Sequence, residues 1–475
     1  MVFSSAIFIM VFLPLFLLVY YATPARFHSH MIVIGSYVFY GWWRVDFLAM
    51  CAGVTLFSYL VSKQIVKSEA HKKHWLILGV CGNLMALAYF KYFNFGIDSL
   101  NALLGYAGQS GFTAWHVILP IGISFHIFQA VSYLIDIYRK DAHPADKFID
   151  FMAFSSLFPQ LIAGPVIRYK DLEDQFRSRT HTWEKFNEGA IRFAMGFCKK
   201  IFIADTLAPI ADAAFALENP TLADSWLGIL AYTAQLYFDF SGYSDMAIGI
   251  ALMMGFRFIE NFNHPYISRS ITEFWRRWHI SLSTWLRDYL YIPLGGNRKG
   301  NVRTYINLVL TMVLGGLWHG ANWTFVLWGA WHGGIMAVER ALGAKKETPY
   351  PKMVALPLTL LMVFIGWVLF RAPNVTSALS MYAGMIGLQG GALSDQMAWT
   401  ITNFQIVTLV VAYMLILMPL VTARRAQPAP VVCGEKTTWA YGLSNARQIG
   451  ICVLFTLGLC KLIAQSFSPF LYFQF

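Results

Sequence analysis

The centre of the chain reads Glu273-Phe-Trp-Arg-Arg-Trp-His279-Ile-Ser-Leu-Ser-Thr-Trp-Leu-Arg-Asp288, and a second segment, Gly315-Gly-Leu-Trp-His319-Gly-Ala-Asn-Trp323, follows it. Each segment sets one histidine among tryptophans, whereas most of the remaining chain consists of apolar runs. The apolar run that ends just before His319 is long enough to carry this side chain into a membrane. Because an ionisable group at such depth is costly, it is a candidate functional site by default.

The composition is that of a membrane protein. Of the 475 residues, 57% are hydrophobic and 13% are charged, whereas a soluble domain carries about 25% charged residues. We therefore expect an all-α, polytopic membrane protein and treat residues 1–475 as one multi-pass domain, with a catalytic core near residues 117–342. The formal net charge of +11 reflects either basic cytoplasmic loops or attraction of an anionic ligand, such as a nucleotide-bearing donor.

Several kinds of site find no support in the sequence. The six cysteines have no Cys-x-x-Cys spacing, which argues against a zinc site or a disulfide framework. The histidines are too dispersed for a convincing metal site. We find no Walker-type phosphate loop, no Gly-x-Ser-x-Gly motif and no signal for nucleic-acid binding. The sequence therefore predicts no metal, no bound cofactor and no nucleic-acid partner.

Apolar runs of about 17 to 25 residues are long enough to cross a bilayer, and by this measure we expect about eleven or twelve membrane spans. The candidates are residues 5–22, 31–43, 47–62, 75–93, 117–138, 224–254, 304–318, 323–341, 353–370, 404–422 and 449–464. Basic residues follow the first, third and fifth of these runs, so the N-terminus should face outward and these loops the cytoplasm. Residues 94–115 carry no positive charge and are expected to form an outer loop.

Three further segments are too short or too charged to span. Residues 148–163 stop at a proline and a Gly-Pro pair, which predicts a re-entrant or interfacial segment. Residues 189–204 mix apolar and basic side chains, as in an amphipathic helix lying along the membrane surface. Residues 269–292 alternate aromatic and charged residues and are placed at the interface or inside the protein.

His319 has two interpretations. It is either a structural histidine that hydrogen-bonds a neighbouring helix or a general base in a lined pocket. Gly315 and Gly316 would let helices approach closely, and Trp318 and Trp323 would wall the pocket. At 1.5 Å per residue the histidine lies roughly 22 Å from the basic end of its helix, within a hydrocarbon region about 30 Å thick. A neutral imidazole there is suited to take a proton from an attacking hydroxyl.

His279 lies in a segment rich in tryptophan and arginine. It is either an interfacial structural residue or a second polar group that positions the donor or the acceptor. The neighbouring Arg276 and Arg277 either extend to lipid headgroups or pair with the phosphates of an activated donor.

Two acidic residues, Asp239 and Asp245, lie in the apolar run 224–254. They are six residues apart, so they occupy different faces of one helix unless the helix breaks at Gly242. An acidic group in an apolar helix usually pairs with a basic one, and this favours structural ion pairs that support the site over catalytic carboxylates. His332 is interpreted as a structural histidine or one that supports the site from behind.

These central segments resemble the membrane-bound O-acyltransferase family. The other matching stretches are spread over most of the chain and comprise residues 1–5, Leu119-Pro-Ile-Gly-Ile-Ser-Phe125, Leu161-Ile-Ala-Gly-Pro165, residues 235–249 and residues 468–475. The resemblance implies a ring of transmembrane helices, with re-entrant or interfacial helices, around a central funnel whose thin floor holds the active site. The near-invariant histidine of the family falls on His319, and its second active-site position, Asn or His, falls on His279.

The activity implied by this resemblance is acyl transfer from a thioester to a hydroxyl group. In the branch that acetylates exopolysaccharides, it implies a cytoplasmic acetyl donor, acetyl-CoA, and export of the acetyl group through a protein of the bacterial inner membrane. Periplasmic acetyltransferase partner proteins of the polysaccharide machinery then complete esterification. Alginate is the expected polymer, with cellulose or another cell-surface polymer as the alternative.

A rival interpretation is a proton-coupled transporter in which His319 relays protons. Buried acidic residues and glycine pairs would suit a transporter as well. Such a protein should show repeated halves, and the sequence shows no long repeat. A third interpretation, an assembly scaffold without chemistry, predicts no transferase activity in the purified protein.

Overall fold

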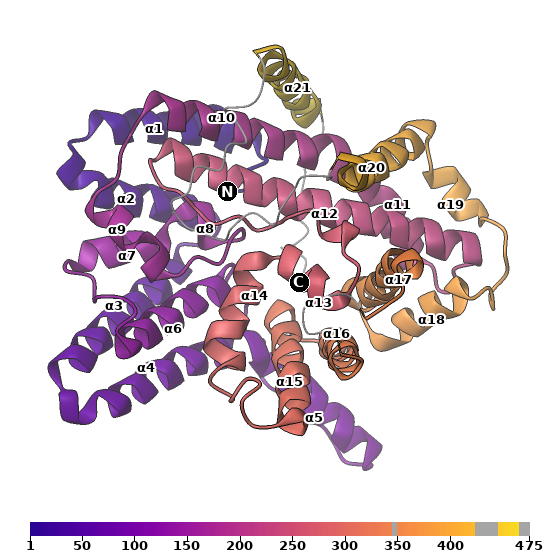
Figure 1. The fold of residues 1–475 in the computed structure, drawn as a ribbon, viewed down its shortest axis with the longest axis horizontal. Coiled ribbons are helices and arrows are strands. Elements are labelled where there is room, and N and C mark those ends of the chain that lie inside the picture. The colour runs from indigo at the N-terminus through magenta and orange to yellow at the C-terminus, as the bar shows by residue number, and fades with distance from the viewer. Residues whose placement is uncertain (344–348, 423–444, 465–475) are drawn as a thin grey trace. The chain divides into compact units, whose positions relative to one another are not determined.

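The computed structural model describes residues 1–343, 349–422 and 445–464, and this part of the chain is built from helices without any strand (Figure 1). The predicted all-α fold class is confirmed. The terminal stretch 468–475 that contributes to the family resemblance lies outside the described residues. So does most of the predicted loop between residues 423 and 446.

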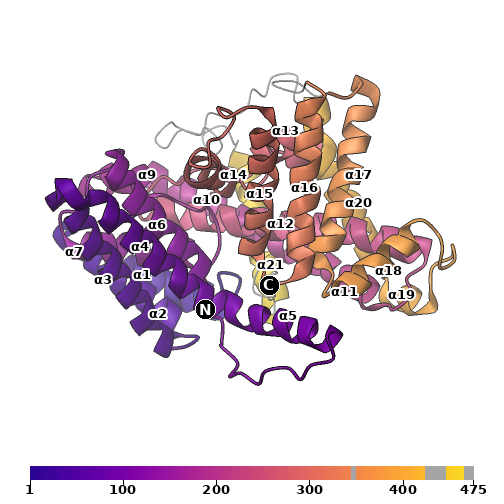
Figure 2. The ribbon, with the colours of Figure 1, turned by 90° about the horizontal axis from the view of Figure 1, so that it is seen from below.

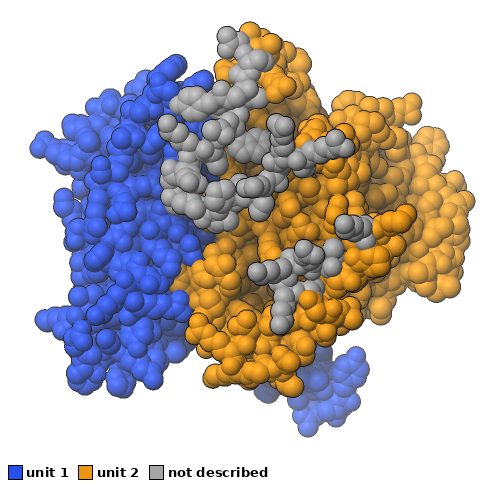
Figure 3. Space-filling view, viewed as in Figure 1, with its two compact units in different colours: residues 1–190, 247–258 blue, residues 191–246, 259–475 orange. Residues whose placement is uncertain are grey.

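The chain divides into two compact units, coloured separately in Figure 3. Unit 1 comprises Met1–Ala190 and Ala247–Phe258, and unit 2 comprises Ile191–Met246 and Ile259–Phe475. Both candidate histidines lie in unit 2. The description of residues 1–475 as one domain, with a core near residues 117–342, stays a prediction.

The helices of unit 1 come from the first part of the chain. They are α1 (Leu13–Ala22), α2 (His28–Gly41), α3 (Asp46–Lys67), α4 (Lys72–Leu87), α5 (Phe93–Tyr106), α6 (Ile123–Arg139), α7 (Phe148–Ser156), α8 (Phe158–Leu161) and α9 (Tyr169–Arg177). The broken pair α7 and α8 replaces any full span over residues 148–163, as the proline and the Gly-Pro pair predict. The expected outer loop at residues 94–115 is wrong in its first half, because α4 continues into α5 through a π-helical turn at Ala88–Tyr92.

Two long helices, α10 (Trp183–Cys198) and α12 (Leu222–Met253), contribute residues to both units. The remaining helices belong to unit 2. They are α11 (Asp205–Ala216), α13 (Ile271–Arg277), α14 (Ile280–Leu286), α15 (Asn301–His319), α16 (Trp323–Ala341), α17 (Lys352–Arg371), α18 (Val375–Met385), α19 (Asp395–Thr400), α20 (Asn403–Thr422) and α21 (Asn445–Ala464). The charged segment 269–292 thus forms short helices and not a span.

Five helical runs in the described part of the chain are long and apolar enough to cross a membrane. They are Asp46–Lys67, Glu69–Tyr106, Met353–Arg371, Asn403–Thr422 and Ala446–Ala464. A shorter apolar helix covers Phe8–Ala22. These runs support the predicted multi-pass fold, whereas the expected total of about eleven or twelve spans stays a prediction.

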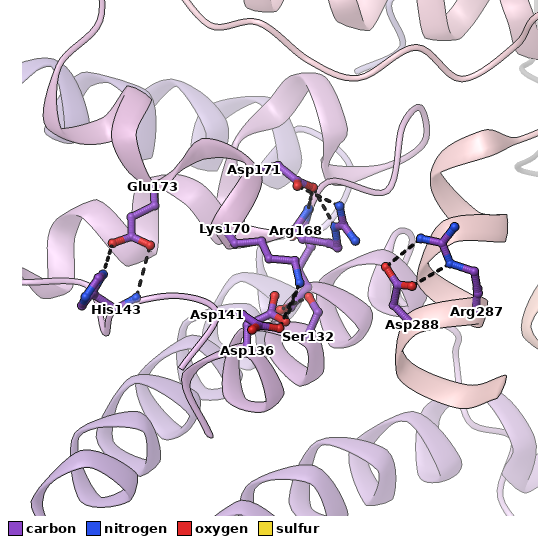
Figure 4. A network of polar contacts seen from close by, with 11 residues as sticks. Ser132, Asp136, Asp141, His143, Arg168, Lys170, Asp171, Glu173, Arg287 and Asp288 are labelled. Carbon is purple, nitrogen blue, oxygen red and sulfur yellow. Dashed lines mark hydrogen bonds and ion pairs between the residues drawn. The ribbon is translucent and has the colours of Figure 1, made fainter. Parts of the chain in front are cut away.

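Within unit 1, polar contacts hold α9 in place (Figure 4). Lys170 lies 2.9 Å from the fully buried carboxylate of Asp136 on α6. His143 lies 3.0 Å from Glu173, and Arg168 pairs with Asp171 at the start of α9. The charged segment that begins near residue 168 is therefore tied to the apolar helices of its own unit.

Helix α12 runs unbroken past Gly242, which serves as a contact point and not as the break that the sequence left open. A Cβ atom at Gly242 would lie 2.7 Å from the carbonyl oxygen of Gly196 on α10, and one at Gly196 would lie 2.4 Å from the carbonyl oxygen of Gly242. Each glycine therefore lets the two backbones touch.

Helices α15 and α16 form a tight hairpin and lie side by side in Figure 2. Asn322 caps α16 by accepting a hydrogen bond from the backbone N–H of Thr324. A Cβ atom at Gly316 would lie 2.2 Å from the carbonyl oxygen of Phe325. One at Gly329 would lie 2.4 Å from a carbonyl oxygen of α15.

We expect Gly329→Ala to force the hairpin apart and to lower the free energy of unfolding by about 1–3 kcal/mol, the usual cost of overpacking. Gly334→Ala on the same helix is the matched control, because its Cβ would meet nothing within 4 Å. The control should be neutral or stabilise the helix by about 0.5–1 kcal/mol. Thermal unfolding of both variants in detergent measures the difference, and equal melting temperatures would contradict the backbone contact.

Candidate functional site

His319 is the last residue of α15 and is 5% exposed. Its ring is packed edge-on against three aromatic side chains. The ring centroids lie 5.0 Å from Trp318, 5.2 Å from Trp328 and 5.2 Å from Phe370. The helix end therefore delivers the imidazole into an aromatic cluster, whose rings fix its orientation.

His279 joins α13 to α14 and is fully buried. Its backbone is left-handed, with φ 45° and ψ 53°, a conformation that costs a residue with a Cβ atom about 1–2 kcal/mol. Two hydrogen bonds clamp this turn against the segment before α13. Ile280 donates to the carbonyl oxygen of Asn261 at 2.9 Å, and Asn263 donates to the carbonyl oxygen of Arg277 at 2.9 Å. Strain that the surroundings hold in this way is typical of functional positions.

The side chain of Asn261 sets the proton arrangement on His279. Its Oδ1 lies 3.0 Å from Nδ1 of the histidine, and it also accepts hydrogen bonds from the hydroxyl (2.8 Å) and the backbone N–H of Ser281. Since an amide oxygen only accepts, Nδ1 carries the proton. His279 lies outside the five candidate spans, and burial lowers its pKa to about 3, so the ring is neutral. Nε2 is then an unprotonated acceptor, buried without a hydrogen-bond partner among the described residues.

The rings of the two histidines lie close together. Their ring centroids lie 6.3 Å apart, and His279 lies 6.3 Å from Trp318 and 4.7 Å, edge-on, from Phe240. This separation is short enough for one small group to contact both rings, and a hydroxyl donates its single proton to one of them at a time. A pair of imidazoles around one hydroxyl oxygen can orient it and accept its proton.

Of the two tryptophans that were predicted to wall the pocket, only one is buried. Trp318 is buried, but Trp323 is 54% exposed, because it is the first residue of α16. Trp328 and Phe370 complete the cluster around His319, and no sequence pattern points to either. Trp328 precedes His332 by four residues on one helix, and this spacing places both on one face.

His332 is fully buried among Trp275, Trp328 and Trp367, with ring centroids 5.5, 5.2 and 6.3 Å away. Neither of its ring nitrogens has a hydrogen-bond partner among the described residues. Its interpretation as a supporting histidine fits this position behind the aromatic cluster.

The arginines before His279 differ in their surroundings. Arg277 lies 2.9 Å from Glu273 and donates to the carbonyl oxygen of Asn263 at 3.3 Å, so it braces α13 against the preceding segment. Arg276 is exposed. Their pairing with lipid headgroups or with donor phosphates stays a prediction.

Asp239 and Asp245 have basic partners, as the sequence interpretation favoured. Lys200 lies 2.8 Å from Asp239, and Arg192 and Lys199 lie 2.9 and 2.6 Å from Asp245. These cations belong to the segment expected along the membrane surface. Their charged side chains turn inward to the carboxylates of α12, and the place of this segment along the membrane surface stays a prediction. Among the described residues, no group of three His, Cys, Asp or Glu side chains could hold a metal ion.

A buried carboxylate connects the elements that carry the two histidines. Glu339 on α16 is fully buried and accepts hydrogen bonds from the backbone N–H of Ile271 (2.7 Å) and of Thr272 (2.9 Å). The hydroxyl of Thr272 donates to the same carboxylate at 2.7 Å. A carboxylate at a helix N-terminus is favoured by free N–H groups and by the helix dipole. Helix α13 is thereby fixed to α16, which itself packs on the helix that ends at His319.

Comparison with known proteins shows what this chain is similar to. Residues 145–382 match the model of MBOAT, the membrane-bound O-acyltransferase family, and both histidines lie in the matched region. The probable alginate O-acetylase AlgI of Pseudomonas putida is 54% identical over 485 residues, and that of Azotobacter vinelandii is 53% identical over 500 residues. Both alignments cover 100% of each chain. A peptidoglycan O-acetyltransferase of Helicobacter pylori is 35% identical over 524 residues, covering 100% of this chain and 98% of the relative.

The family match and the apolar helices together make this protein a multi-pass membrane enzyme that transfers acyl groups to oxygen. The chain belongs to the membrane-bound O-acyltransferase family.

Proposed function

We propose that the protein takes an acetyl group from cytoplasmic acetyl-CoA and passes it across the bacterial inner membrane for the O-acetylation of alginate. Support for the polymer comes from the relatives named as probable alginate O-acetylases, which match the whole chain at 53% and 54% identity. The relative named for peptidoglycan is 35% identical over a similar length, which favours alginate over peptidoglycan. Cellulose stays the alternative polymer.

In the proposed reaction, His319 acts as the general base. The acceptor hydroxyl gives its proton to the imidazole, and the oxygen attacks the carbonyl carbon of the acetyl thioester. The carbon–sulfur bond breaks, and the departing thiolate takes the proton back from the imidazolium. The products are an acetyl ester and free CoA thiol, so protons and electrons balance without another reactant.

In this proposal His279 orients the acceptor. Its Nε2 is an unprotonated acceptor, and its ring lies 6.3 Å from that of His319. The acceptor hydroxyl would donate to Nε2 of His279 in one orientation and to the imidazole of His319 in another. It would therefore stay close to both rings. Trp318, packed beside both histidines, would exclude water from the reacting groups.

The division between the two sides of the membrane follows from the chemistry of the reactants. CoA is polyanionic and does not cross a bilayer, whereas the polymer is assembled outside. A protein that joins them must pass the acetyl group through its own interior. Periplasmic acetyltransferase partners of the polysaccharide machinery would then complete esterification.

The observation that carries this proposal is the pair of buried imidazoles, that of His319 at the end of α15 and that of His279 between α13 and α14. Its test is the ester-linked acetyl content of each polymer secreted by a strain lacking the gene. Alginate should lose its acetyl groups and regain them when the wild-type gene is returned. Loss of acetyl groups from a different polymer, with alginate unchanged, would overturn the choice of substrate.

His279→Ala should lower kcat about 10- to 100-fold, because an orienting hydrogen bond to the reacting hydroxyl is lost. The effect should be smaller than that of removing the general base. Initial rates with the membrane-reconstituted protein and acetyl-CoA measure it. A kcat within twofold of the wild-type value would exclude this role for His279.

A further inference from the structure

A chain of buried polar groups lies behind His279 in unit 2. Asn261, which is 1% exposed, belongs to the segment between α12 and α13. Its Nδ2 donates to the hydroxyl of Ser244 on α12 at 3.0 Å. Its Oδ1 accepts from Nδ1 of His279 at 3.0 Å and from Ser281. The amide thus connects the long helix α12 to the imidazole of His279.

The orientation of this amide is fixed by its partners. The backbone N–H of Ser281, which can only donate, points to Oδ1 of Asn261 at 3.4 Å. If the amide were flipped, an NH₂ group would face this N–H, and two donors would oppose each other. Ser244 accepts from the other end in the orientation observed. The oxygen of Asn261 therefore faces the imidazole.

This orientation selects one of the two neutral forms of His279. With the proton on Nε2, two acceptors would face each other at the 3.0 Å between Nδ1 and Oδ1. Two facing acceptors without a proton between them disfavour that form, although the hydroxyl of Ser281 lies 3.4 Å from Nδ1. The form with the proton on Nδ1 is therefore dominant, and its lone pair lies on the side of the ring away from Asn261.

We propose that Asn261 is a positioning residue for acyl transfer, which holds His279 in the form whose Nε2 accepts a hydrogen bond from the acceptor hydroxyl. This inference rests on the proposed function and adds a residue to it. Asn261 also holds the histidine backbone, because its carbonyl oxygen accepts from Ile280. That contact survives any change of the side chain, so side-chain variants remove only the contacts of the amide with His279, Ser281 and Ser244.

The test is a double-mutant cycle in the full-length protein reconstituted in lipid vesicles, with acetyl-CoA as the donor. Asn261→Ala should lower kcat about 10-fold, since the wrong form of the imidazole becomes populated. The KM for acetyl-CoA should change less than twofold. In a His279→Ala background, Asn261→Ala should cause no further loss of kcat, because it acts only through the imidazole.

Asn307→Ala provides the matched control for a purely structural loss. Asn307 is a fully buried asparagine of unit 2, whose amide donates to the carbonyl oxygens of Leu294 (3.3 Å) and Gly296 (3.0 Å). Its loss should lower the melting temperature while kcat per folded molecule stays close to the wild-type value.

Two results would overturn the role of Asn261. One is a kcat for Asn261→Ala within twofold of the wild-type value. The other is a loss that is just as large in the His279→Ala background, which would show a general structural defect. Failure of the proposed function is distinct, since the wild-type protein itself would then transfer no acetyl group from acetyl-CoA.

Discussion

His319→Ala is expected to remove nearly all acetyl transfer, with a fall in rate of about 10²- to 10⁴-fold, the usual contribution of a general base. The physical reason is that the aromatic side chains packed edge-on against this ring, Trp318, Trp328 and Phe370, cannot accept a proton from a hydroxyl. His279, whose ring lies 6.3 Å away, orients the acceptor in this account and does not replace the base. Acetyl content of the secreted polymer, normalised to the amount of inserted protein, measures the loss.

The control for this variant is His74→Ala, because His74 is an exposed histidine of unit 1. Its polymer should be acetylated as in the wild type. The shorter side chain of His319→Ala leaves a cavity in the aromatic cluster, so its folding should be checked by thermal unfolding. A well-folded His319→Ala protein that still acetylates its polymer fully would refute the assignment of the base.

Glu339→Ala is expected to cost about 2–4 kcal/mol of folding free energy, because it leaves buried N–H groups at the start of α13 without an acceptor. Activity should fall with stability, since α13 leads directly into His279. Its measurement is thermal unfolding in detergent together with the initial rate per folded molecule. The melting temperature and the initial rate of Glu339→Gln should lie between those of the wild type and of Glu339→Ala, because the amide retains one accepting oxygen.

Glu218→Ala is the control for the loss of a carboxylate. Glu218 is exposed, and exposed substitutions usually change stability by less than about 0.5 kcal/mol. If Glu339→Ala unfolded at the same temperature as this control, the carboxylate could not be the link between α13 and α16.

The hairpin that carries His319 was predictable from the sequence almost to the residue. Residues 304–318 and 323–341 were expected as helices, and the structure has Asn301–His319 and Trp323–Ala341. Local signals are sufficient here. Each helix is one continuous apolar run, a glycine follows the first, and Asn322 is a favoured capping residue before the second.

The contacts around the histidines were not predictable, because they join segments far apart in the chain. Asn261 meets His279 through a left-handed turn, and such a turn at a histidine has no local sequence signal. Phe370, which is 51 residues after His319 in the sequence, contacts its ring from another helix. Tertiary packing alone brings these pairs together.

The orientation of charged side chains was the other point that composition could not supply. Basic residues in an apolar segment suit a helix on a membrane surface equally well as buried ion pairs. Arg192 and Lys200 form buried ion pairs, because α12 presents Asp245 and Asp239 opposite them. The carboxylates were visible in the sequence, but the pairing depends on Gly196 and Gly242 letting the helices touch.

The most direct measurement is the acceptor-dependent release of CoA thiol from acetyl-CoA by the purified protein in lipid vesicles, compared between the wild type and His319→Ala. If the imidazole of His319 takes the proton of the acceptor, the wild type should release one CoA thiol for each acetylated product. The rate of thiol release by His319→Ala should be at least about 10²-fold lower. Equal rates from the two proteins would contradict the account.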